Sequence, residues 1–409
     1  MGAACAAHRS AAPAGRRLEL ADIVRVHGEK YQRTYRLASV QHKALRAIAA
    51  CRTAVFGGHR ETCDHCGAVR VSYNSCRNRH CPKCQTLPKE RWLAARCAEL
   101  LPIPYFHVVF TLPHALNALA QGNPRVLYTL LFRAAADTLL AFGRDPRQLG
   151  GTIGVTTILH TWGQNLSQHL HVHCLVTGGA LNPEGTHWIP SRPTFLFPVR
   201  ALSRVFRAKY LEGLRAAFEA GQLTFAAGTI ALADRPPFER FIASLRATEW
   251  VVYAKRPFAG PTQVLEYLGR STHRVALSND RLVSLEGGVV RFRWRDYADH
   301  DRPKVLALAV DEFLRRFLLH VLPAGLMRIR HFGLLANRRK REHLDRCRQL
   351  LDAPPPVLAP PASAADLLQR LTGVDLTRCP VCHDGHMRIT AILAPLPRWV
   401  LPVRPVDTS

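Results

Sequence analysis

The sequence predicts an α+β protein, in which an antiparallel sheet with flanking helices follows a small zinc-ribbon-like domain. Runs rich in β-branched and aromatic residues at 105–112, 154–160 and 169–176 predict three strands. The second and third runs are close enough along the chain to be antiparallel neighbours. Apolar residues at helical spacing predict two helices within 18–51 and a long helix over 124–142.

The remaining elements follow from the same patterns. Helices are expected at 87–101, 202–220, 238–247, 264–272 and 311–322, and beyond Asn337 in the basic segment 328–351. Short strands are expected at 250–254, 275–278, 282–285 and 289–294.

The net charge of the chain indicates what kind of partner it binds. The chain has 409 residues with 47% hydrophobic content, and 56 Lys and Arg against 30 Asp and Glu give a net charge of +26. Such an excess predicts a polyanion partner, for which DNA or another nucleic acid is the first candidate and an acidic membrane surface the competitor. No apolar run approaches the length of a membrane span, and residues 1–17 lack the apolar stretch of a signal peptide. A cytoplasmic protein that does not enter the membrane is therefore expected.

Two Cys-x2-Cys pairs stand fourteen residues apart. Cys63 and Cys66 form the first pair and Cys81 and Cys84 the second. Four thiolates in two such pairs suit the tetrahedral coordination of a structural Zn²⁺ ion. Cys76 and His80 are the alternates that could replace a ligand or build a second site. A third pair, Cys379 and Cys382, is a weak signal that leaves zinc binding there undecided.

Three histidines recur at every second residue in the run His169-Leu170-His171-Val172-His173. On a β-strand these imidazoles share one face, while Leu170, Val172 and Cys174 point to the opposite, buried face. Neutral imidazoles converging on one point form a ready site for a divalent metal. The sequence therefore predicts a metal site on this strand.

Composition and motifs divide the chain into five segments. Residues 1–18 are expected to be a disordered tail, and 19–101 a zinc-binding domain that docks DNA. A core over 102–352 carries the histidine strand and ends in the basic segment. A Pro-rich linker, 353–366, leads to a C-terminal tail, 367–409.

Basic side chains near the motifs are candidates for phosphate contacts. They flank the cysteine pairs, follow Tyr267 at helical spacing, and form a run before the last predicted core helix. The DNA-binding candidates are Arg77, Arg79, Arg270, Arg274, Arg338, Arg339 and Lys340. Tyr267 offers a phenol nucleophile on a helix flanked by Gly and Arg, although core packing is the ordinary role of any single tyrosine.

The run from His169 to Gly179 resembles the histidine–hydrophobe–histidine motif of the HUH superfamily of single-strand DNA nucleases. More narrowly, the chain is similar to rolling-circle insertion-sequence transposases of the insertion-sequence-ninety-one family. The family's Cys-Arg-Asn-Arg-His-Cys-Pro-x-Cys run is matched by 76–84, its first strand by 107–113, its tyrosine helix by 267–270 and its late segment by 330–338. These matches occur in order from about residue 20 to 345.

The resemblance implies a HUH nuclease core with Mg²⁺ or Mn²⁺ on His171 and His173. It implies that Tyr267 attacks a DNA phosphate to give a 5′-phosphotyrosine and a free 3′-OH. The third metal ligand stays open between His169 and Gln164. A zinc domain for DNA docking completes the implied transposase.

One position departs from the family pattern. Members commonly carry two tyrosines four residues apart, whereas Ser271 stands four residues after Tyr267 here. A serine hydroxyl ionises less readily than a phenol and is a worse leaving group than a phenolate. The chain is expected to work as a single-tyrosine enzyme or to be impaired in strand transfer. The alternatives are a replication-initiator or relaxase-like nicking enzyme and a non-catalytic zinc-dependent DNA-binding protein.

Overall fold

A central five-stranded antiparallel sheet organises the fold. The computed structural model describes residues 17–255, 263, 269, 276–297, 299–355 and 363–396. The sheet has the order β12-β4-β5-β3-β8, and each neighbouring pair is antiparallel. Its strands are β3 (Tyr105–Thr111), β4 (Gly154–Trp162), β5 (Gln168–Thr177), β8 (Val252–Lys255) and β12 (Ile329–Gly333). The predicted antiparallel sheet with flanking helices is confirmed.

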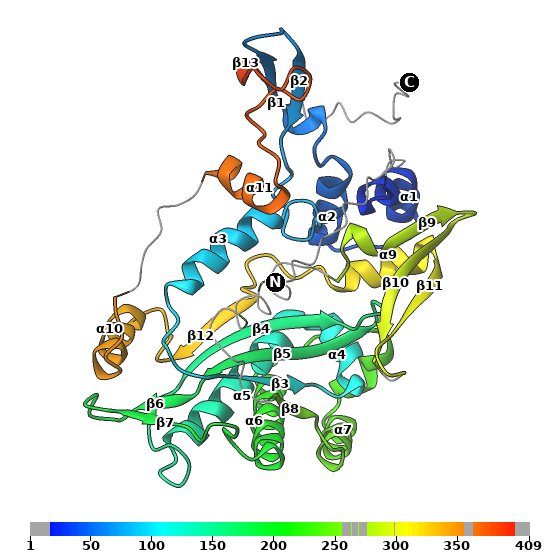
Figure 1. Ribbon diagram of the computed structural model, residues 1–409. Helices are drawn as coiled ribbons and strands as arrows, with labels where there is room; N and C mark the ends of the chain where they lie inside the picture. The colour runs from blue at the N-terminus through cyan, green and yellow to red at the C-terminus, as the bar shows by residue number, and fades with distance from the viewer. Residues whose placement is uncertain are drawn as a thin grey trace.

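Four helices cover one face of this sheet (Figure 1). They are α4 (Asn117–Gly122), α5 (Pro124–Arg144), α6 (Val199–Glu219) and α7 (Arg235–Ala247). Val108 and Phe110 of β3 and Leu170 and Val172 of β5 point into the core beneath these helices. Because strand side chains alternate between faces, His107, His169, His171 and His173 must point to the opposite face.

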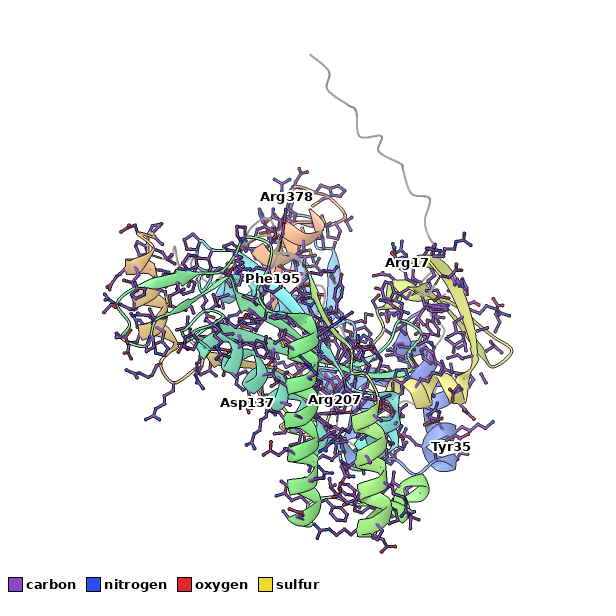
Figure 2. All side chains as sticks on the ribbon, turned by 90° about the horizontal axis from the view of Figure 1, so that it is seen from below. Arg17, Tyr35, Asp137, Phe195, Arg207 and Arg378 are labelled. Atoms are coloured by element: carbon purple, nitrogen blue, oxygen red, sulfur yellow. The ribbon has the colours of Figure 1, made fainter. Side chains whose placement is uncertain are left out.

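Helices α6 and α7 run beside each other on the outer side of this layer (Figure 2). Arg207 of α6 donates a hydrogen bond to the carbonyl oxygen of Thr248, at 2.9 Å, just after α7 ends. Arg215 and Glu239 form a second link between the two helices, at 2.7 Å.

Helix α5 corrects one expectation drawn from the sequence. It is the one described helix long and apolar enough, by length and composition, to cross a membrane. Its side chains Leu127, Leu131, Phe132 and Leu139 are fully buried in the protein core, where α5 contacts α6 and β4. The apolar length of α5 is therefore explained by the helix being central to the fold.

The other face of the sheet lies toward the N-terminal part of the chain (Figure 1). Helices α1 (Leu20–Thr34) and α2 (Ser39–Ala49) share a core with α9 (Val310–Leu319) and with a three-stranded sheet of order β11-β10-β9. The strands of that sheet are β9 (Leu282–Glu286), β10 (Val289–Asp296) and β11 (Arg302–Ala309). Helices α3 (Thr86–Cys97) and α10 (Lys340–Leu350) flank the opposite end of the face.

A third sheet joins the two ends of the described chain. Strand β13 (Met387–Leu393) pairs with β1 (Gly58–Cys63), which pairs in turn with β2 (Val69–Tyr73). Helix α11 (Ala364–Thr372) precedes this last strand and contacts α3. The segment expected to be a C-terminal tail is thus joined to the zinc-binding region over 374–393.

The smaller elements complete the description. A two-stranded sheet consists of β6 (Gly179–Leu181) and β7 (Trp188–Pro190), and four short 3-10 helices span Ala54–Phe56, His114–Leu116, Ala227–Ala233 and Asn279–Arg281. The strand expected at 275–278 does not form over its described residues, 276–278. Seven described strands were not expected from the sequence, namely β1, β2, β6, β7, β11, β12 and β13.

Candidate active site and cysteine clusters

Three histidines from two neighbouring strands meet on one face of the central sheet. His160 of β4 is the direct pairing partner of His171 of β5, and His173 lies two residues further along β5. The ligand nitrogens of these three imidazoles lie within 4.8 Å of one another. His160 and His171 are each only 8% exposed. This histidine cluster (His160, His171 and His173) has the donor set of a transition-metal site.

Hydrogen bonds to the Nδ1 atoms orient the cluster. His171 Nδ1 lies 2.9 Å from the carbonyl oxygen of His169, and His173 Nδ1 lies 2.8 Å from His107 Nε2. A carbonyl can only accept, so His171 Nδ1 carries the proton and its Nε2 keeps a free lone pair. Such outer partners fix the tautomer and ring orientation of metal-binding histidines. His171 therefore has its Nε2 atom available as a ligand, and His107 orients the ring of His173.

Burial keeps these rings neutral. It lowers the pKa of His173 to about 3 and that of His107 to about 4, and it holds the pKa of His171 well below the ordinary 6.5. Neutral imidazole is the form that binds metal, so the cluster is ready to bind a metal at neutral pH.

The sequence candidates for the third ligand are placed elsewhere. The side-chain amide of Gln164 donates a hydrogen bond to the hydroxyl of Tyr297, at 3.0 Å. The backbone carbonyl oxygen of Gln164 accepts one from Arg281. His169 Nδ1 lies 3.2 Å from His114 Nε2. Among the described residues, His160 takes the third position instead of either candidate.

His160 was missed because a register shift decides its partner. Counting back from the loop 163–167, where Trp162 pairs with Gln168, would place residue 160 opposite Leu170, but the irregularity between His160 and Trp162 brings it opposite His171 instead. Trp162 stacks on the His160 ring with centroids 4.7 Å apart and an angle of 24° between the planes. This contact holds the third imidazole in place.

The predicted nucleophile lies outside the described residues. The structure does not describe Tyr267, Arg270, Ser271 or Arg274. Gly269 is described and buried, and a Cβ atom built on it would lie 2.7 Å from Leu93 Cδ1 of α3. Gly269 therefore packs closely against α3.

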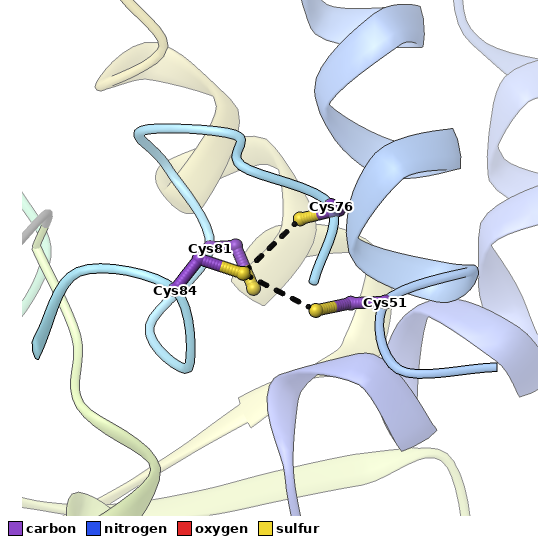
Figure 3. A group of neighbouring side chains, drawn as sticks. All are labelled: Cys51, Cys76, Cys81 and Cys84. Carbon is purple, nitrogen blue, oxygen red and sulfur yellow. Dashed lines mark hydrogen bonds between the residues drawn. The ribbon is translucent and has the colours of Figure 1, made fainter. Parts of the chain in front are cut away.

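The cysteines form two clusters, and neither is the predicted set. The first cluster (Cys51, Cys76, Cys81 and Cys84) brings four sulfur atoms within 4.8 Å of one another (Figure 3). Cys84 Sγ lies 3.3 Å from Cys51 Sγ and 3.5 Å from Cys76 Sγ. Hydrogen bonds from neighbouring thiols lower the pKa of Cys84, and one with Cys76 lowers that of Cys51 to about 7.

The second cluster (Cys63, Cys66, Cys379 and Cys382) joins the first cysteine pair to the C-terminal pair. The prediction of a single zinc site was wrong for the set Cys63, Cys66, Cys81 and Cys84. Strand β1 places Cys63 in the sheet with β13, in a different cluster from Cys81. The alternate Cys76 is a member of the first cluster. Cys51 was missed, since it belongs to no Cys-x2-Cys pair.

The alternate His80 has a structural role. Its Nε2 accepts a hydrogen bond from the backbone N–H of Leu322, at 3.2 Å, and burial lowers its pKa to about 3. His80 joins the loop of the first cluster to the end of α9. It lies in none of the described metal-ready groups.

The basic candidates separate into free and internally bonded side chains. Arg77 and Arg338 are exposed. Arg79 donates to the carbonyl oxygens of Leu326 and Pro323, at 2.7 and 3.0 Å, and burial lowers its pKa. Arg79 is therefore an internal link, which corrects its assignment to DNA.

The other two described candidates form ion pairs, Arg339 on the surface and Lys340 in a part-buried position. Arg339 pairs with Glu342 at 2.8 Å, and Lys340 pairs with Glu99 of the α3 end at 2.5 Å. Lys340 thus joins α10 to α3 in addition to any contact with solvent.

Comparisons with known proteins agree with this architecture. A sequence family described as "Transposase zinc-binding domain" matches residues 23–112, and one described as "Putative transposase" matches 154–343. The first match spans α1 to β3 with the first cluster, and the second includes the histidine cluster.

Two curated relatives match most of the chain. "Putative transposase y4qJ" of Sinorhizobium fredii is 52% identical over 373 residues, covering 90% of this chain and 94% of the relative. The transposase for insertion sequence element IS801 of Pseudomonas savastanoi pv. phaseolicola is 28% identical, covering 88% of this chain and 86% of the relative.

Among solved structures, the conjugative relaxase TrwC in complex with OriT DNA covers 60% of this chain and 71% of its own. The identity is 14% and the TM-score 0.21.

The two family matches and the relative of 52% identity show that the chain is a transposase with an N-terminal zinc-binding domain. The predicted class of protein is confirmed. The chain belongs to the IS91 family of insertion-sequence transposases.

Proposed function

We propose that this transposase nicks single-stranded DNA at the ends of a mobile element and transfers the cut strand through a covalent tyrosine intermediate. The observation that carries the proposal is the histidine cluster, in which three imidazoles from β4 and β5 bring their ligand nitrogens within 4.8 Å of one another and outer hydrogen bonds orient the rings of His171 and His173. Tyr267 is the nucleophile by the resemblance of its segment to the family's tyrosine helix.

The step balances without another reactant. The Tyr267 phenol gives up its proton as its oxygen forms a bond to phosphorus, while the bond from phosphorus to the 3′ oxygen breaks. The 3′ oxygen takes up a proton, which leaves a 5′-phosphotyrosine and a free 3′-OH. Because the phosphodiester energy is kept in the new bond, a second 3′-OH can reverse the step at a target site without ATP.

His160, His171 and His173 would hold the divalent ion. When bound, that ion polarises a non-bridging phosphate oxygen and offsets the charge that develops during attack. Three imidazoles favour a transition-metal ion such as Mn²⁺ over Mg²⁺, which prefers oxygen ligands. Trp162 and His107 hold the rings in place, so the site costs little to organise when it binds metal.

Charge would bring the DNA to this site. The net charge of +26 and the exposed Arg77 and Arg338 favour contacts with phosphates, and Arg270 and Arg274 would hold phosphates beside Tyr267. Zinc in the N-terminal region would keep the docking domain folded. We place this activity in the cytoplasm, where a bacterial element's DNA would be available.

Denaturing-gel analysis tests the proposal. Purified chain is incubated with Mn²⁺ and 5′- or 3′-labelled single-stranded DNA carrying the element's ends. We expect a protein–DNA adduct with the wild-type chain and none with Tyr267→Phe, His171→Ala or His160→Ala. The matched control is His187→Ala, which removes an exposed histidine outside the cluster and should leave the adduct unchanged.

The other outcomes favour the alternatives. Cleavage without an adduct would indicate a metal hydrolase. Binding without cleavage would favour a DNA-binding protein in which the histidines are structural. A Ser271→Tyr variant then asks whether a second tyrosine increases strand transfer, as expected if the single phenol limits the second step.

A further inference from the structure

We infer that the second cluster binds its own zinc ion, and that this ion cross-links the C-terminal segment to the N-terminal zinc-binding region. We call this cross-link the clasp. The match to the zinc-binding domain ends at residue 112 and does not include Cys379 or Cys382. The two halves of the site lie more than 300 residues apart in the sequence. No single stretch of chain could supply this site.

The sulfur geometry fits a tetrahedral ion. Cys63 Sγ lies 3.8 Å from Cys382 Sγ, and Cys66 Sγ lies 3.7 Å from Cys379 Sγ. A tetrahedron with Zn–S bonds of about 2.3 Å has S···S edges of about 3.8 Å. Both of these pairs therefore stand at the separation that zinc requires, and all four sulfur atoms lie within 4.8 Å of one another.

Backbone N–H groups point at the sulfurs in both halves. The amides of His65 and Cys66 donate to Cys63 Sγ at 3.4 and 3.5 Å, and that of Val381 donates to Cys379 Sγ at 3.4 Å. The amide of Gly385 donates to Cys382 Sγ at 3.4 Å. Donors aimed at sulfur stabilise the thiolate form that binds metal.

The sheet around the site has too small a core to fold alone. Its buried residues are Cys63, Cys379 and Met387, with Ala68 and Cys382 packed against them. Other large apolar side chains of the sheet face solvent, with Val69 62% and Ile392 78% exposed. A core of this size stabilises a sheet only when a metal or another cross-link adds to it.

Direct contacts bring the two segments into register. Strand β13 pairs with β1 from Met387 opposite Cys63 to Leu393 opposite Gly58. The His386 amide donates to Asp64 Oδ1 at 2.7 Å, and Arg70 donates to the carbonyl oxygen of Leu376 at 2.8 Å. A bound zinc ion would stabilise this pairing of β13 with β1.

The clasp also bears on α3. Helix α11 leads into the C-terminal half of the site and lies against α3, the helix whose Leu93 contacts Gly269 (Figure 1). If Tyr267 is the nucleophile of the proposed function, loss of the clasp should weaken adduct formation by loosening the contact of α3 with Gly269, two residues after Tyr267 in the sequence.

Zinc counting on the full chain tests the clasp. All chains carry His171→Ala, which prevents zinc from occupying the histidine cluster. We expect two zinc ions per chain in this parent, one in Cys382→Ser and one in Cys76→Ser. Cys97→Ser, which removes an exposed cysteine outside both clusters, should keep two.

An unchanged zinc count in Cys382→Ser would overturn the proposal. If that variant fails to fold, cobalt titration of the parent decides. Absorption from thiolate-to-cobalt charge transfer should rise to a second equivalent, whereas saturation at one equivalent refutes the second site. The count is independent of nicking, so an absent adduct in the wild-type chain together with two zinc ions in the His171→Ala parent counts against the proposed function alone.

Discussion

His107 Nε2 lies 2.8 Å from His173 Nδ1, and the two rings are stacked with an angle of 9° between their planes. His107 stands on β3 and His173 on the neighbouring β5, where the direct partner of His173 is Val109. His107 is therefore a positioning residue that reaches diagonally across the sheet to hold a metal ligand.

His107→Ala should weaken binding of Mn²⁺ to the histidine cluster by roughly 10- to 100-fold, because His173 loses the partner that fixes its ring. Manganese affinity is measured by isothermal titration and by the Mn²⁺ concentration at half-maximal adduct formation. His107→Gln keeps a hydrogen-bond acceptor and should recover part of the affinity. Equal Mn²⁺ affinities in all three chains would show that His107 only fills space.

Gly333→Ala should destabilise the fold far more than Gly325→Ala. Both glycines have positive φ, +61° and +72°, but a Cβ on Gly333 would lie 1.9 Å from the carbonyl oxygen of Ile153, whereas Gly325 faces open space. The left-handed conformation alone costs an alanine about 1–2 kcal/mol. Urea unfolding compares the two variants, and similar losses would contradict the packing of β12 on β4.

Acid should destabilise the protein partly through His320. Its Nε2–H donates to the Leu166 carbonyl, Thr161 lies 3.2 Å from its Nδ1, and burial lowers its pKa to about 4. The unfolded chain, with a pKa near 6.5, takes up the proton first. Stability is therefore lost as the pH falls from about 6.5 toward 4, by about 3 kcal/mol for this group.

The check on His320 is urea unfolding of wild type and His320→Gln at pH 7.5 and 5. His320→Gln should be less stable at pH 7.5 and should lose less on acidification, because glutamine does not titrate. Parallel losses in the two chains would assign the acid sensitivity to other groups.

Arg79 and Arg77 should behave differently although they are two residues apart. Arg79→Ala should lower the free energy of unfolding, because it removes hydrogen bonds to two carbonyl oxygens of the loop after α9. Arg77→Ala should leave stability unchanged and reduce the salt dependence of DNA binding by about one phosphate contact. Thermal unfolding and binding at several salt concentrations separate the two effects. A reversed pattern would show that the exposed side chain is the structural one.

Local signals in the sequence were sufficient for much of the central sheet. The alternation of His169, His171 and His173 with Leu170 and Val172 follows from the two-residue repeat of a strand, and β5 has its core face where that repeat puts it. Strand β12 was not predicted because its residues lie in a segment rich in basic side chains, without the pattern of a strand. Its pairing with β4 is what makes it a strand.

The sequence by itself determined which residue types were available: thiols in close pairs, imidazoles on alternate positions, and an excess of positive charge. Only the tertiary structure decided which of them meet. Cys63 and Cys66 join Cys379 and Cys382 because β1 pairs with β13, and His160 joins His171 because β4 pairs with β5. The spacing of ligands along a chain predicts which of them can meet only within one turn or strand. Ligands from distant segments are brought together by strand pairing and core packing.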